Sequence, residues 1–385
     1  MTEKERNLLM VSADRWVVAG DKGPFYYMLE AFHQHWDRID VIGTRPEKMD
    51  QKTVFDNVHL HHPTSGKIAQ AGFIARTGKA LCQERSYAVI TSHDYSPPYN
   101  GLGAWRISRG SGVPYVAEIH HVPGFPKAAT LRERLDKVVM RCYAKWAAGR
   151  AAGFRVVNST ELPPLLKAWG VPEERIHVLP SLYLDLETFF PRSKGKKDAP
   201  TSDLLMVGRL VPNKGVLQTL EALHRLITRG MTGTTLTLVG RGPLEETVDQ
   251  FVASRSLQDH VTRIPWVENS ADLAAVYRQS RILVCASTSE GGPRIVGEAM
   301  ACGTPVISTR VGIAPEMISH QENGLLYDGT VEHLTLLLQR FLTDAKQEMA
   351  LRSNLPGDLS SYGKEKVIAR LAEGLMAISK NSHHR

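Results

Sequence analysis

Short apolar segments rich in β-branched residues alternate along this chain with stretches whose apolar residues recur at helical spacing. Strand–helix alternation of this kind is typical of a parallel sheet covered by helices on both faces. The strands predicted in the first half are Asn7–Ala13, Arg38–Gly43, Tyr87–Ser92, Pro114–Ile119 and Phe154–Ser159. Those predicted in the second half are Asp203–Arg209, Thr234–Gly240, Arg281–Ser287 and Thr304–Thr309.

A polar, basic stretch bounded by Pro191 and Pro200 separates the two series, and a length of 385 residues suits two domains. The pattern predicts the α/β class, with two doubly wound Rossmann-like domains facing each other across a cleft. Ligands of such sheets bind beyond the carboxyl ends of the strands, so we expect the site in that cleft. The expected order is a first domain over residues 1–182, a hinge over 183–200, a second domain over 201–360 and a C-terminal helix and tail over 361–385. The last predicted helix, Lys364–Ile378, could pack on either domain.

The segment Ser287–Thr309, STSEGGPRIVGEAMACGTPVIST, combines a turn, a helix and a strand. Glu290 opens the turn, and the helix is expected to begin at Pro293 and to stop at Gly303. The free N–H groups and the dipole of a helix N-terminus attract anions, above all phosphate. Glycines such as Gly292 let a ligand approach the backbone closely. This segment therefore predicts a phosphate site.

A phosphate does not explain the two carboxylates of this segment. Carboxylates accept hydrogen bonds from hydroxyl groups, so Glu298 suits a ribose diol and Glu290 suits a second sugar beyond a diphosphate. Each acid alone could instead complement the helix dipole, which is worth ~0.3–1 kcal/mol. The combination favours a nucleotide bound through both its phosphates and its sugar.

Cations to balance such a ligand follow another predicted strand, in VGRLVPNKG (Val207–Gly215). Arg209 can clamp a phosphate in bidentate fashion, and Lys214 adds a mobile point charge. Read alone, the two could be surface cations. LVGRGP (Leu238–Pro243) adds a less specific glycine pair, and the chain has neither a P-loop nor a G-x-G-x-x-G fingerprint.

Together these motifs resemble the retaining glycosyltransferases of family four, which have the GT-B fold. The resemblance covers essentially the whole second domain, and its most specific part is Glu290-x₇-Glu298 with the tail AMACGTPV. It implies that Arg209 and Lys214 bind the donor diphosphate, that Glu290 contacts the transferred sugar and that Glu298 contacts the ribose. The backbone that would meet the phosphates is that of Gly292, Arg294, Ile295 and Val296.

The first domain resembles this family more loosely. In VPYVAEIHHVPG, His120 takes the position of a histidine that lies near the transferred sugar, although it could be a hydrogen-bonded histidine at a strand end. His121 stands where the family usually has aspartate, which alters the local hydrogen bonding. Gly20 and Gly23 resemble a glycine-rich loop that faces phosphate and acceptor. His93 and Asp94 are further candidates for acceptor contact, although Asp94 could equally cap a helix.

The resemblance implies transfer of a glycosyl group from a UDP- or GDP-sugar to a hydroxyl, with retention at the anomeric carbon. The acceptor would be lipid-linked, a polysaccharide or a small molecule. The catalytic set is then His120, Glu290, Arg209 and Lys214. No Asp-x-Asp stands in a metal-binding context, so we expect neither a metal ion nor a cofactor beyond the donor.

Three other functions use the same kind of fold. A sugar-nucleotide 2-epimerase would need an acid–base set near the sugar, which the sequence does not reveal. A non-catalytic sugar-nucleotide-binding protein would not need the full set of two glutamates, two cations and His120. An NAD-dependent oxidoreductase is disfavoured by the missing fingerprint.

Charge adds one feature to this picture. The chain has a net charge of +7, and Lys127–Arg155 holds eight basic residues against two acidic ones. Apolar residues recur at helical spacing in the same stretch, which predicts a basic amphipathic helix. This helix could pack on a sheet with a solvated basic face, or it could be attracted to an anionic membrane surface. No nucleic-acid motif accompanies the charge.

Four scattered cysteines, Cys82, Cys142, Cys285 and Cys302, favour a reducing compartment over a disulfide framework. The first residues lack the cleavage site of a signal peptide, and no apolar run approaches the ~18–20 residues of a bilayer span. We therefore expect a cytoplasmic protein, peripheral on the inner face of the membrane if the basic helix binds lipid. The sequence leaves the oligomeric state open.

Overall fold

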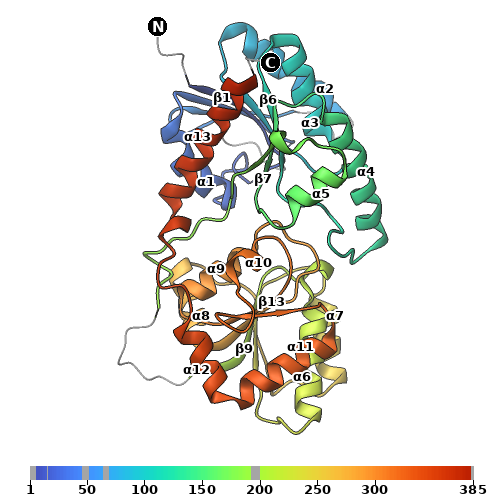
Figure 1. Ribbon diagram of the computed structural model, residues 1–385, viewed down its shortest axis with the longest axis vertical. Coiled ribbons are helices and arrows are strands. Elements are labelled where there is room, and N and C mark those ends of the chain that lie inside the picture. The colour runs from blue at the N-terminus through green and yellow to red at the C-terminus, as the bar shows by residue number, and fades with distance from the viewer. Residues whose placement is uncertain (1–5, 15, 46–51, 64–68, 192–199, 383–385) are drawn as a thin grey trace. The chain divides into compact units, whose positions relative to one another are not determined.

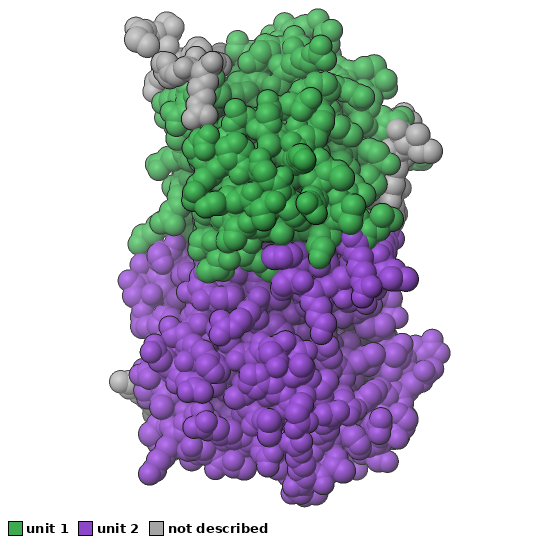
Figure 2. All heavy atoms as spheres, turned by 45° about the vertical axis from the view of Figure 1, so that its right-hand side comes forward, with its two compact units in different colours: residues 1–122, 135–181, 364–385 green, residues 123–134, 182–363 purple. Residues whose placement is uncertain are grey.

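The protein is described from a computed structural model, which places residues 6–14, 16–45, 52–63, 69–191 and 200–382. The chain divides into two compact units, each built around its own sheet (Figures 1 and 2). The first unit comprises residues 1–122, 135–181 and 364–385, and the second comprises residues 123–134 and 182–363.

The first unit contains an eight-stranded sheet in the order β3-β4-β2-β1-β5-β6-β7-β8. All neighbouring strands are parallel except β3 and β4. Its strands are β1 (Asn7–Val11), β2 (Arg38–Ile42), β3 (Thr53–Val54), β4 (Val58–His61), β5 (Val89–His93), β6 (Tyr115–Ile119), β7 (Gly153–Val156) and β8 (Ile176–Val178).

Helices cover both faces of this sheet (Figure 1). They are α1 (Pro24–Phe32), α2 (Gln70–Glu84), α3 (Tyr99–Ser111), α4 (Leu131–Ala147), α5 (Leu162–Ala168) and α13 (Lys364–Ser382), with 3₁₀ turns η1 (His33–His35) and η3 (Glu173–Arg175). The C-terminal helix α13 returns to this unit and packs along α1. Lys364 pairs with Glu30 at 2.8 Å, and the Ser379 hydroxyl donates to the Ala88 carbonyl at 2.6 Å. The alternative that the sequence left open is thereby decided.

The second unit contains a six-stranded, fully parallel sheet in the order β11-β10-β9-β12-β13-β14. Its strands are β9 (Ser202–Val207), β10 (Leu236–Val239), β11 (Val261–Ile264), β12 (Ser280–Cys285), β13 (Val306–Thr309) and β14 (Leu325–Tyr327). Its helices are α6 (Val216–Thr228), α7 (Glu245–Ser254), α8 (Ser270–Arg278), α9 (Arg294–Ala301), α10 (Ala314–Met317), α11 (Val331–Thr343) and α12 (Ala345–Ser353), with 3₁₀ turns η4 (Pro212–Lys214) and η5 (Ser360–Tyr362).

Alternation along each strand divides the core of the second unit into two layers. On β9, Leu204 and Met206 point into the cluster under α6 and α11, whereas Leu205 points into the cluster under α8 and α9. Successive side chains of a strand face opposite sides, so a strand buried on both faces reads as a continuous apolar run. This explains why the apolar runs of the sequence predicted these strands correctly.

All nine strands predicted from the sequence are present, and the α/β prediction with two parallel sheets is confirmed. The predicted hinge over residues 183–200 is described only up to Pro191 and again from Pro200. Within it, Leu184 and Phe189 are buried in the core of the second unit.

Helix α4 packs on the first unit mainly through residues other than the apolar ones that predicted it. Its buried residues are Met140, Tyr143, Ala144 and Ala147. Leu131, Leu135 and Val138 are instead 79%, 64% and 55% exposed. Leu131, Leu135 and Val138 therefore face solvent beside the basic residues. The expected packing of the helix with a solvated basic face is present, but other residues make the packing.

Candidate active site

Two loops of the second unit emerge where its strand order changes direction. The order runs outward from β9 on one side and from β12 on the other, and ligands of open α/β sheets bind beyond the carboxyl ends of the strands at such a point. The loop after β9 carries Arg209 and Lys214, and the loop after β12 carries Glu290. The ammonium group of Lys214 is ion-paired with Oε1 of Glu290. Two of the predicted donor residues are thus brought into contact.

Hydrogen bonds lock these two loops to each other. The side-chain amide of Asn213 donates to the Ser289 carbonyl at 3.2 Å, and the backbone N–H of Thr288 donates to the Asn213 carbonyl at 2.8 Å. The Ser287 hydroxyl donates to Oε1 of Glu290 at 3.1 Å. Both members of the ion pair are mostly buried, with side chains 19% and 16% exposed. The pair is therefore held in a defined position rather than on a mobile surface.

A glycine makes this close approach possible. Gly215 has φ +70° and directly follows Lys214, and a Cβ at this position would lie 2.2 Å from the carbonyl oxygen of Ala286. Any larger residue would combine a strained backbone with a collision. Gly215 therefore places Lys214 against the end of β12.

The glycines of LVGRGP have a similar packing role. A Cβ on Gly240 would lie 1.9 Å from the Gly208 carbonyl oxygen, and one on Gly242 would lie 2.5 Å from that of Leu210. These glycines let the loop after β10 pack against the backbone on both sides of Arg209. Arg209 itself is exposed at the end of β9.

Glu298 lies in the middle of α9 and is 7% exposed. The Tyr277 hydroxyl donates to its Oε2 at 2.9 Å, and Nε of Arg294 lies 3.7 Å from its Oε1. Burial raises the pKa of the Glu298 carboxyl, against the opposing effects of Arg294 and the Tyr277 hydrogen bond. The Tyr277 hydrogen bond and Arg294 offset only part of the cost of burying this carboxylate. It is therefore suited to accept further hydrogen bonds from a ligand's hydroxyl groups.

The N-terminus of α9 follows the Glu290 turn directly. Helix α9 begins at Arg294, one residue later than expected, so that Pro293 is its N-cap and not its first helical residue. The N–H of Val296 donates to the Pro293 carbonyl at 3.1 Å. A Cβ on Gly312 would lie 2.5 Å from the Gly291 carbonyl oxygen, so the Glu290 turn packs directly against the backbone of Gly312. Arg294 stacks over the Tyr183 ring at 4.7 Å. The phosphate contacts of Gly292, Arg294, Ile295 and Val296 stay a prediction.

In the first unit, His120 lies just beyond β6 and belongs to a buried charged network. Its Nε2 is 3.2 Å from Oε2 of Glu118 and 3.2 Å from Nη1 of Arg155, which also donates to Glu118 at 2.7 Å. Glu118 and Arg155 are register partners on β6 and β7 and are 4% and 3% exposed. Burial lowers the pKa of His120, so its ring is neutral near pH 7.

His93, the last residue of β5, and Asp94, which follows it, take different roles. The His93 ring lies 4.1 Å from that of His120, and burial together with His120 lowers the pKa of His93 to about 3. Asp94 is buried and accepts hydrogen bonds from Tyr143 at 2.6 Å and from Ser92 at 3.1 Å. His93 therefore lies beside the candidate histidine, whereas Asp94 is engaged beneath α4.

Gly20 and Gly23 lie in the loop after β1. Gly20 has φ +83°, and Gly23 is the N-cap of α1, with Pro24 as the first helical residue. In this sheet the strand order changes direction between β1 and β5, so this loop and the His93 segment both follow strands at the switch point.

Two family models cover most of the chain. Residues 25–181 match the glycosyl transferase 4-like domain, and residues 188–357 match glycosyl transferases group 1. A GDP-mannose-dependent alpha-(1-6)-phosphatidylinositol monomannoside mannosyltransferase of Mycolicibacterium smegmatis is 31% identical over 329 residues, covering 79% of this chain and 80% of that protein. The chain belongs to this glycosyltransferase family. The family membership expected from the sequence motifs is confirmed.

Other relatives of this glycosyltransferase-family chain match over less of their length. The D-inositol 3-phosphate glycosyltransferase of Pseudarthrobacter chlorophenolicus is 32% identical over 254 residues, 63% of this chain and 59% of that protein. A second D-inositol 3-phosphate glycosyltransferase, from Segniliparus rotundus, is 27% identical over 63% of this chain and 55% of its own length. The chain thus spans little more than half of these relatives.

Solved structures show the same fold. Anabaena HepE in complex with UDP and glucose superimposes with a TM-score of 0.72 at 18% identity, covering 97% of this chain and all of that one. Sucrose-phosphate synthase from Thermosynechococcus elongatus gives 0.74 at 18% identity, covering 98% of each chain. The GT-B fold expected from the sequence is therefore confirmed.

Several residues of this glycosyltransferase-family site were not predicted. Tyr277 lies outside the quoted motifs. Asn213 and Ser287 lie inside them, but their contacts are made only on folding. Glu118 and Arg155 did leave a signal, because they place opposite charges inside two predicted apolar strands that neighbour each other in a doubly wound sheet. Charges at such positions need a buried partner.

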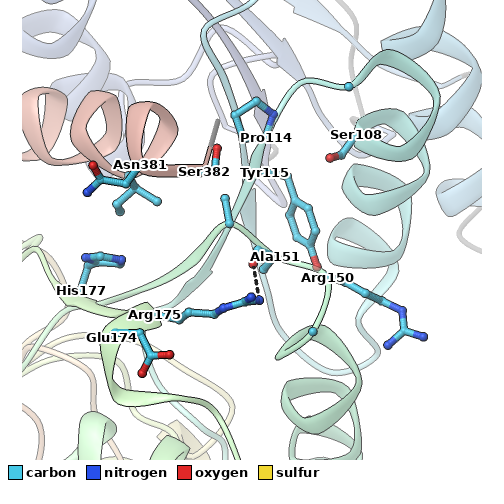
Figure 3. Close-up of a pocket in the computed structure, with 14 residues that line it drawn as sticks. Ser108, Pro114, Tyr115, Arg150, Ala151, Glu174, Arg175, His177, Asn381 and Ser382 are labelled. Carbon is cyan, nitrogen blue, oxygen red and sulfur yellow. Dashed lines mark hydrogen bonds between the residues drawn. The ribbon is translucent and has the colours of Figure 1, made fainter. Parts of the chain in front are cut away.

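A cavity of about 580 Å³ in the first unit lies away from these residues (Figure 3). It opens at the amino ends of β6, β7 and β8, next to Tyr115, Arg175 and His177. His120 and His93 lie at or beyond the carboxyl ends of their strands. Nη1 of Arg175 donates to the Ala148 and Ala151 carbonyls at 2.6 and 3.2 Å. The cavity is therefore at the opposite edge of the sheet from the candidate histidines.

Proposed function

We propose that this protein transfers a sugar from a UDP- or GDP-sugar to a hydroxyl group, with retention at the anomeric carbon. The observation that carries the proposal is the Lys214–Glu290 pair, held between two locked loops beside the N-terminus of α9. A cation beside free helix N–H groups suits a diphosphate, and an acid beside both suits a sugar hydroxyl.

In this proposal Arg209 and Lys214 bind the diphosphate, together with the backbone of Gly292 to Val296. Glu290 accepts hydrogen bonds from the transferred sugar, and Glu298 accepts them from the ribose. In the absence of donor, Lys214 and Glu290 neutralise each other. A donor offers each of them a partner of its own: a phosphate for the ammonium group and hydroxyls for the carboxylate.

The proposed reaction breaks the bond between the anomeric carbon and the diphosphate oxygen, whose electron pair stays with the diphosphate. The acceptor oxygen forms the new bond on the same face of the sugar and loses its proton to the leaving oxygen. Lys214, Arg209 and the dipole of α9 stabilise the developing charge. His120 is proposed to hydrogen-bond the sugar as a neutral ring, consistent with the lowered pKa that burial gives it.

The names of related proteins bear on the classes of donor and acceptor. Named relatives include a GDP-mannose-dependent mannosyltransferase acting on a phosphatidylinositol monomannoside and several D-inositol 3-phosphate glycosyltransferases. These names support a nucleotide sugar as donor and a hydroxyl acceptor that is lipid-linked or a small molecule. A polysaccharide acceptor, the third class expected from the sequence, stays a prediction. We propose a cytoplasmic location at the inner face of the membrane. Among the described residues, no helix has both the length and the apolarity to span a bilayer.

A panel of UDP- and GDP-sugars tests the function. Thermal shift identifies the donor, because a bound ligand stabilises the fold by RT ln(1 + [L]/Kd). Nucleotide release with and without candidate acceptors then separates the alternatives, and NMR of the product reports the anomeric configuration. A 2-epimerase would change the configuration at C2 of the donor sugar without an acceptor and without net release of UDP or GDP, which NMR of the recovered nucleotide sugar detects. A non-catalytic binder would shift the melting temperature but would neither release nucleotide nor change the sugar. Inversion at the anomeric carbon would refute the retaining mechanism.

We expect transfer to persist in EDTA. Arg209, Lys214 and the α9 dipole supply the positive charge that a divalent ion would otherwise provide. Initial rates measured in EDTA, in magnesium and after dialysis against chelator should agree within experimental error. A rate that vanishes in EDTA and returns with magnesium would contradict this part of the proposal.

Donor binding should weaken on acidification at a higher pH than an ordinary glutamate would cause. Glu298 binds ribose best as a carboxylate, and burial raises its pKa above the usual 4.5, so it becomes protonated before exposed acids do. Glu298→Gln should weaken UDP or GDP binding at neutral pH by roughly 10- to 100-fold, as expected for a lost charged hydrogen bond. It should also remove this acid-side dependence.

Isothermal titration calorimetry from neutral to acidic pH measures both effects. Glutamine can still accept the Tyr277 hydrogen bond, which protects the fold. The exposed Glu322→Gln is the matched control and should keep the wild-type profile. If Glu298→Gln keeps the wild-type pH profile, Glu298 is not the group that binds ribose.

A further inference from the structure

Helix α4 carries a second apolar stripe on its outer face. Leu131, Leu135 and Val138 are 79%, 64% and 55% exposed, and Cys142 is exposed as well. Their spacing of four, three and four residues places them along one side of a helix. Exposed aliphatic residues scattered singly need no explanation, but a continuous stripe on one helix marks an interaction surface.

The fold does not need this stripe. The opposite side of α4 packs the helix to the first unit through Met140, Tyr143, Ala144 and Ala147. The Tyr143 hydroxyl donates to the buried Asp94 at 2.6 Å, and the Trp146 ring meets Trp105 edge to face at 5.1 Å. The helix is therefore anchored from beneath, and its outer face is available to a partner.

Basic side chains lie beside the stripe, four of them along one flank and Arg132 on the other. Helix α4 holds five basic residues against two acidic ones: Arg132, Arg134, Lys137, Arg141 and Lys145 against Glu133 and Asp136. Both acids are engaged within the chain. The Glu133 carboxylate accepts from the Ala129 N–H at 2.6 Å, and that of Asp136 accepts from the Ser96 hydroxyl at 2.6 Å. The outer face therefore combines aliphatic groups with net positive charge.

This combination fits one partner better than others. A helix that lies in a membrane interface buries an apolar stripe at the level of the acyl chains and places basic side chains among anionic headgroups. A protein partner would require a complementary acidic rim around an apolar groove. The excess of basic residues on α4 complements anionic headgroups.

We propose that the outer face of α4 docks on an anionic lipid bilayer, with Leu131, Leu135 and Val138 inserted into the headgroup–acyl boundary. The docking itself is independent of the proposed transfer reaction, but its purpose rests on that function. A docked α4 would hold the first unit at the surface on which a lipid-linked acceptor is found.

The test measures binding of the full chain to vesicles. Phosphatidylcholine vesicles rich in phosphatidylglycerol should bind the protein, and pure phosphatidylcholine vesicles should bind it at least ~10-fold less. A triple variant, Leu131→Gln, Leu135→Gln and Val138→Gln, should lose at least ~10-fold in partition coefficient. The matched control is the exposed pair Leu336→Gln and Met349→Gln in the second unit, which should bind like the wild type.

A probe on the stripe itself gives a second readout. Cys142 is exposed and Cys82 is partly buried, so an environment-sensitive dye can be placed on Cys142 in a Cys82→Ser background. Its emission should shift to the blue on anionic vesicles. Unchanged melting temperature and an unchanged shift with nucleotide would show that the triple variant is folded and that the donor site is separate from docking.

Each other outcome overturns the proposal. Wild-type protein that ignores anionic vesicles, or binds neutral ones equally well, contradicts an anionic lipid partner. A triple variant that still binds contradicts the assignment to α4. Light scattering that shows an oligomer in the wild type and a monomer in the triple variant would assign the stripe to a second copy of the chain. A failed donor screen would refute the proposed function and leave the vesicle result standing.

Discussion

Lys214→Ala is expected to lower kcat for sugar transfer by ~10²–10³-fold, the range seen when one preorganised group that stabilises transition-state charge is removed. The loss should be larger than that of an ordinary surface lysine for two reasons. The variant has one cation fewer at the leaving diphosphate, and it leaves Glu290 with no cation beside the place where that anion forms.

Purified variants with donor and acceptor at saturation measure this effect. Lys167→Ala is the matched control, because Lys167 also pairs with a glutamate, Glu173 at 2.8 Å, but does so on the surface of the first unit. Lys214→Arg should recover part of the rate, since it keeps the charge but not the shape. Wild-type turnover in a folded Lys214→Ala protein would refute the assignment of this loop to the donor.

Glu290 should respond in a different way. Glu290→Ala is expected to abolish most transfer as well, because the sugar loses an acceptor for its hydroxyl hydrogen bonds. Binding of UDP or GDP alone should hold or tighten, because an acid beside the diphosphate has been removed. This opposite movement of transfer and nucleotide affinity distinguishes contact with the sugar from a general disturbance of the loop.

The sequence was sufficient to predict the fold because parallel strands buried on both faces leave continuous apolar runs. The strands it missed were β3, β4, β8, β11 and β14. β3, β8, β11 and β14 are edge strands, and β4 is the neighbour of an edge strand. Strand β8 has only three residues. Short strands near an edge carry little apolar pattern, so only the neighbouring strand defines them.

The candidate site was predictable where it rests on backbone chemistry. Lys214 and Glu290 were found because glycines and a proline mark the turns that carry them. The side chains that hold the site in place were not found, because Tyr277 and Asn213 act through contacts between distant segments. For α4 the sequence pattern gave the helix but not its orientation. Its small buried residues, such as Ala144 and Ala147, attract less attention than the exposed leucines.

The second large effect concerns stability. Arg155→Met should lower the free energy of unfolding by about 3–5 kcal/mol at neutral pH, because it leaves Glu118 as an uncompensated buried charge. Burial by itself would raise the pKa of the Glu118 carboxyl, but Arg155 and the hydrogen bond to His120 outweigh it and hold the pKa well below the usual range. In the variant, burial is no longer outweighed by Arg155.

The sign of the pH dependence follows from these two states. In the wild type the depressed pKa contributes stability above the pKa of the unfolded chain, and this is lost as pH falls. In Arg155→Met the pKa is raised instead, so the penalty grows as pH rises through the unfolded value and shrinks on acidification. Denaturant unfolding should therefore give a larger difference between the proteins near pH 7 than near pH 4. At pH 4 the penalty of the variant has shrunk, but the wild type keeps most of its contribution, because that is lost only as pH falls through the depressed pKa of the folded state. Lys167→Met removes one member of an exposed ion pair and should leave the free energy of unfolding close to the wild-type value at both pH values.

The double variant Glu118→Leu with Arg155→Met separates stability from function. Replacing both members of a buried pair by apolar residues is often neutral for stability, so most of the lost free energy should return. Transfer should not return with it, because His120 has lost both groups that lie 3.2 Å from its Nε2 and so its fixed orientation. A double variant that recovers both stability and wild-type turnover would show that the network serves the core of the first unit and not the histidine.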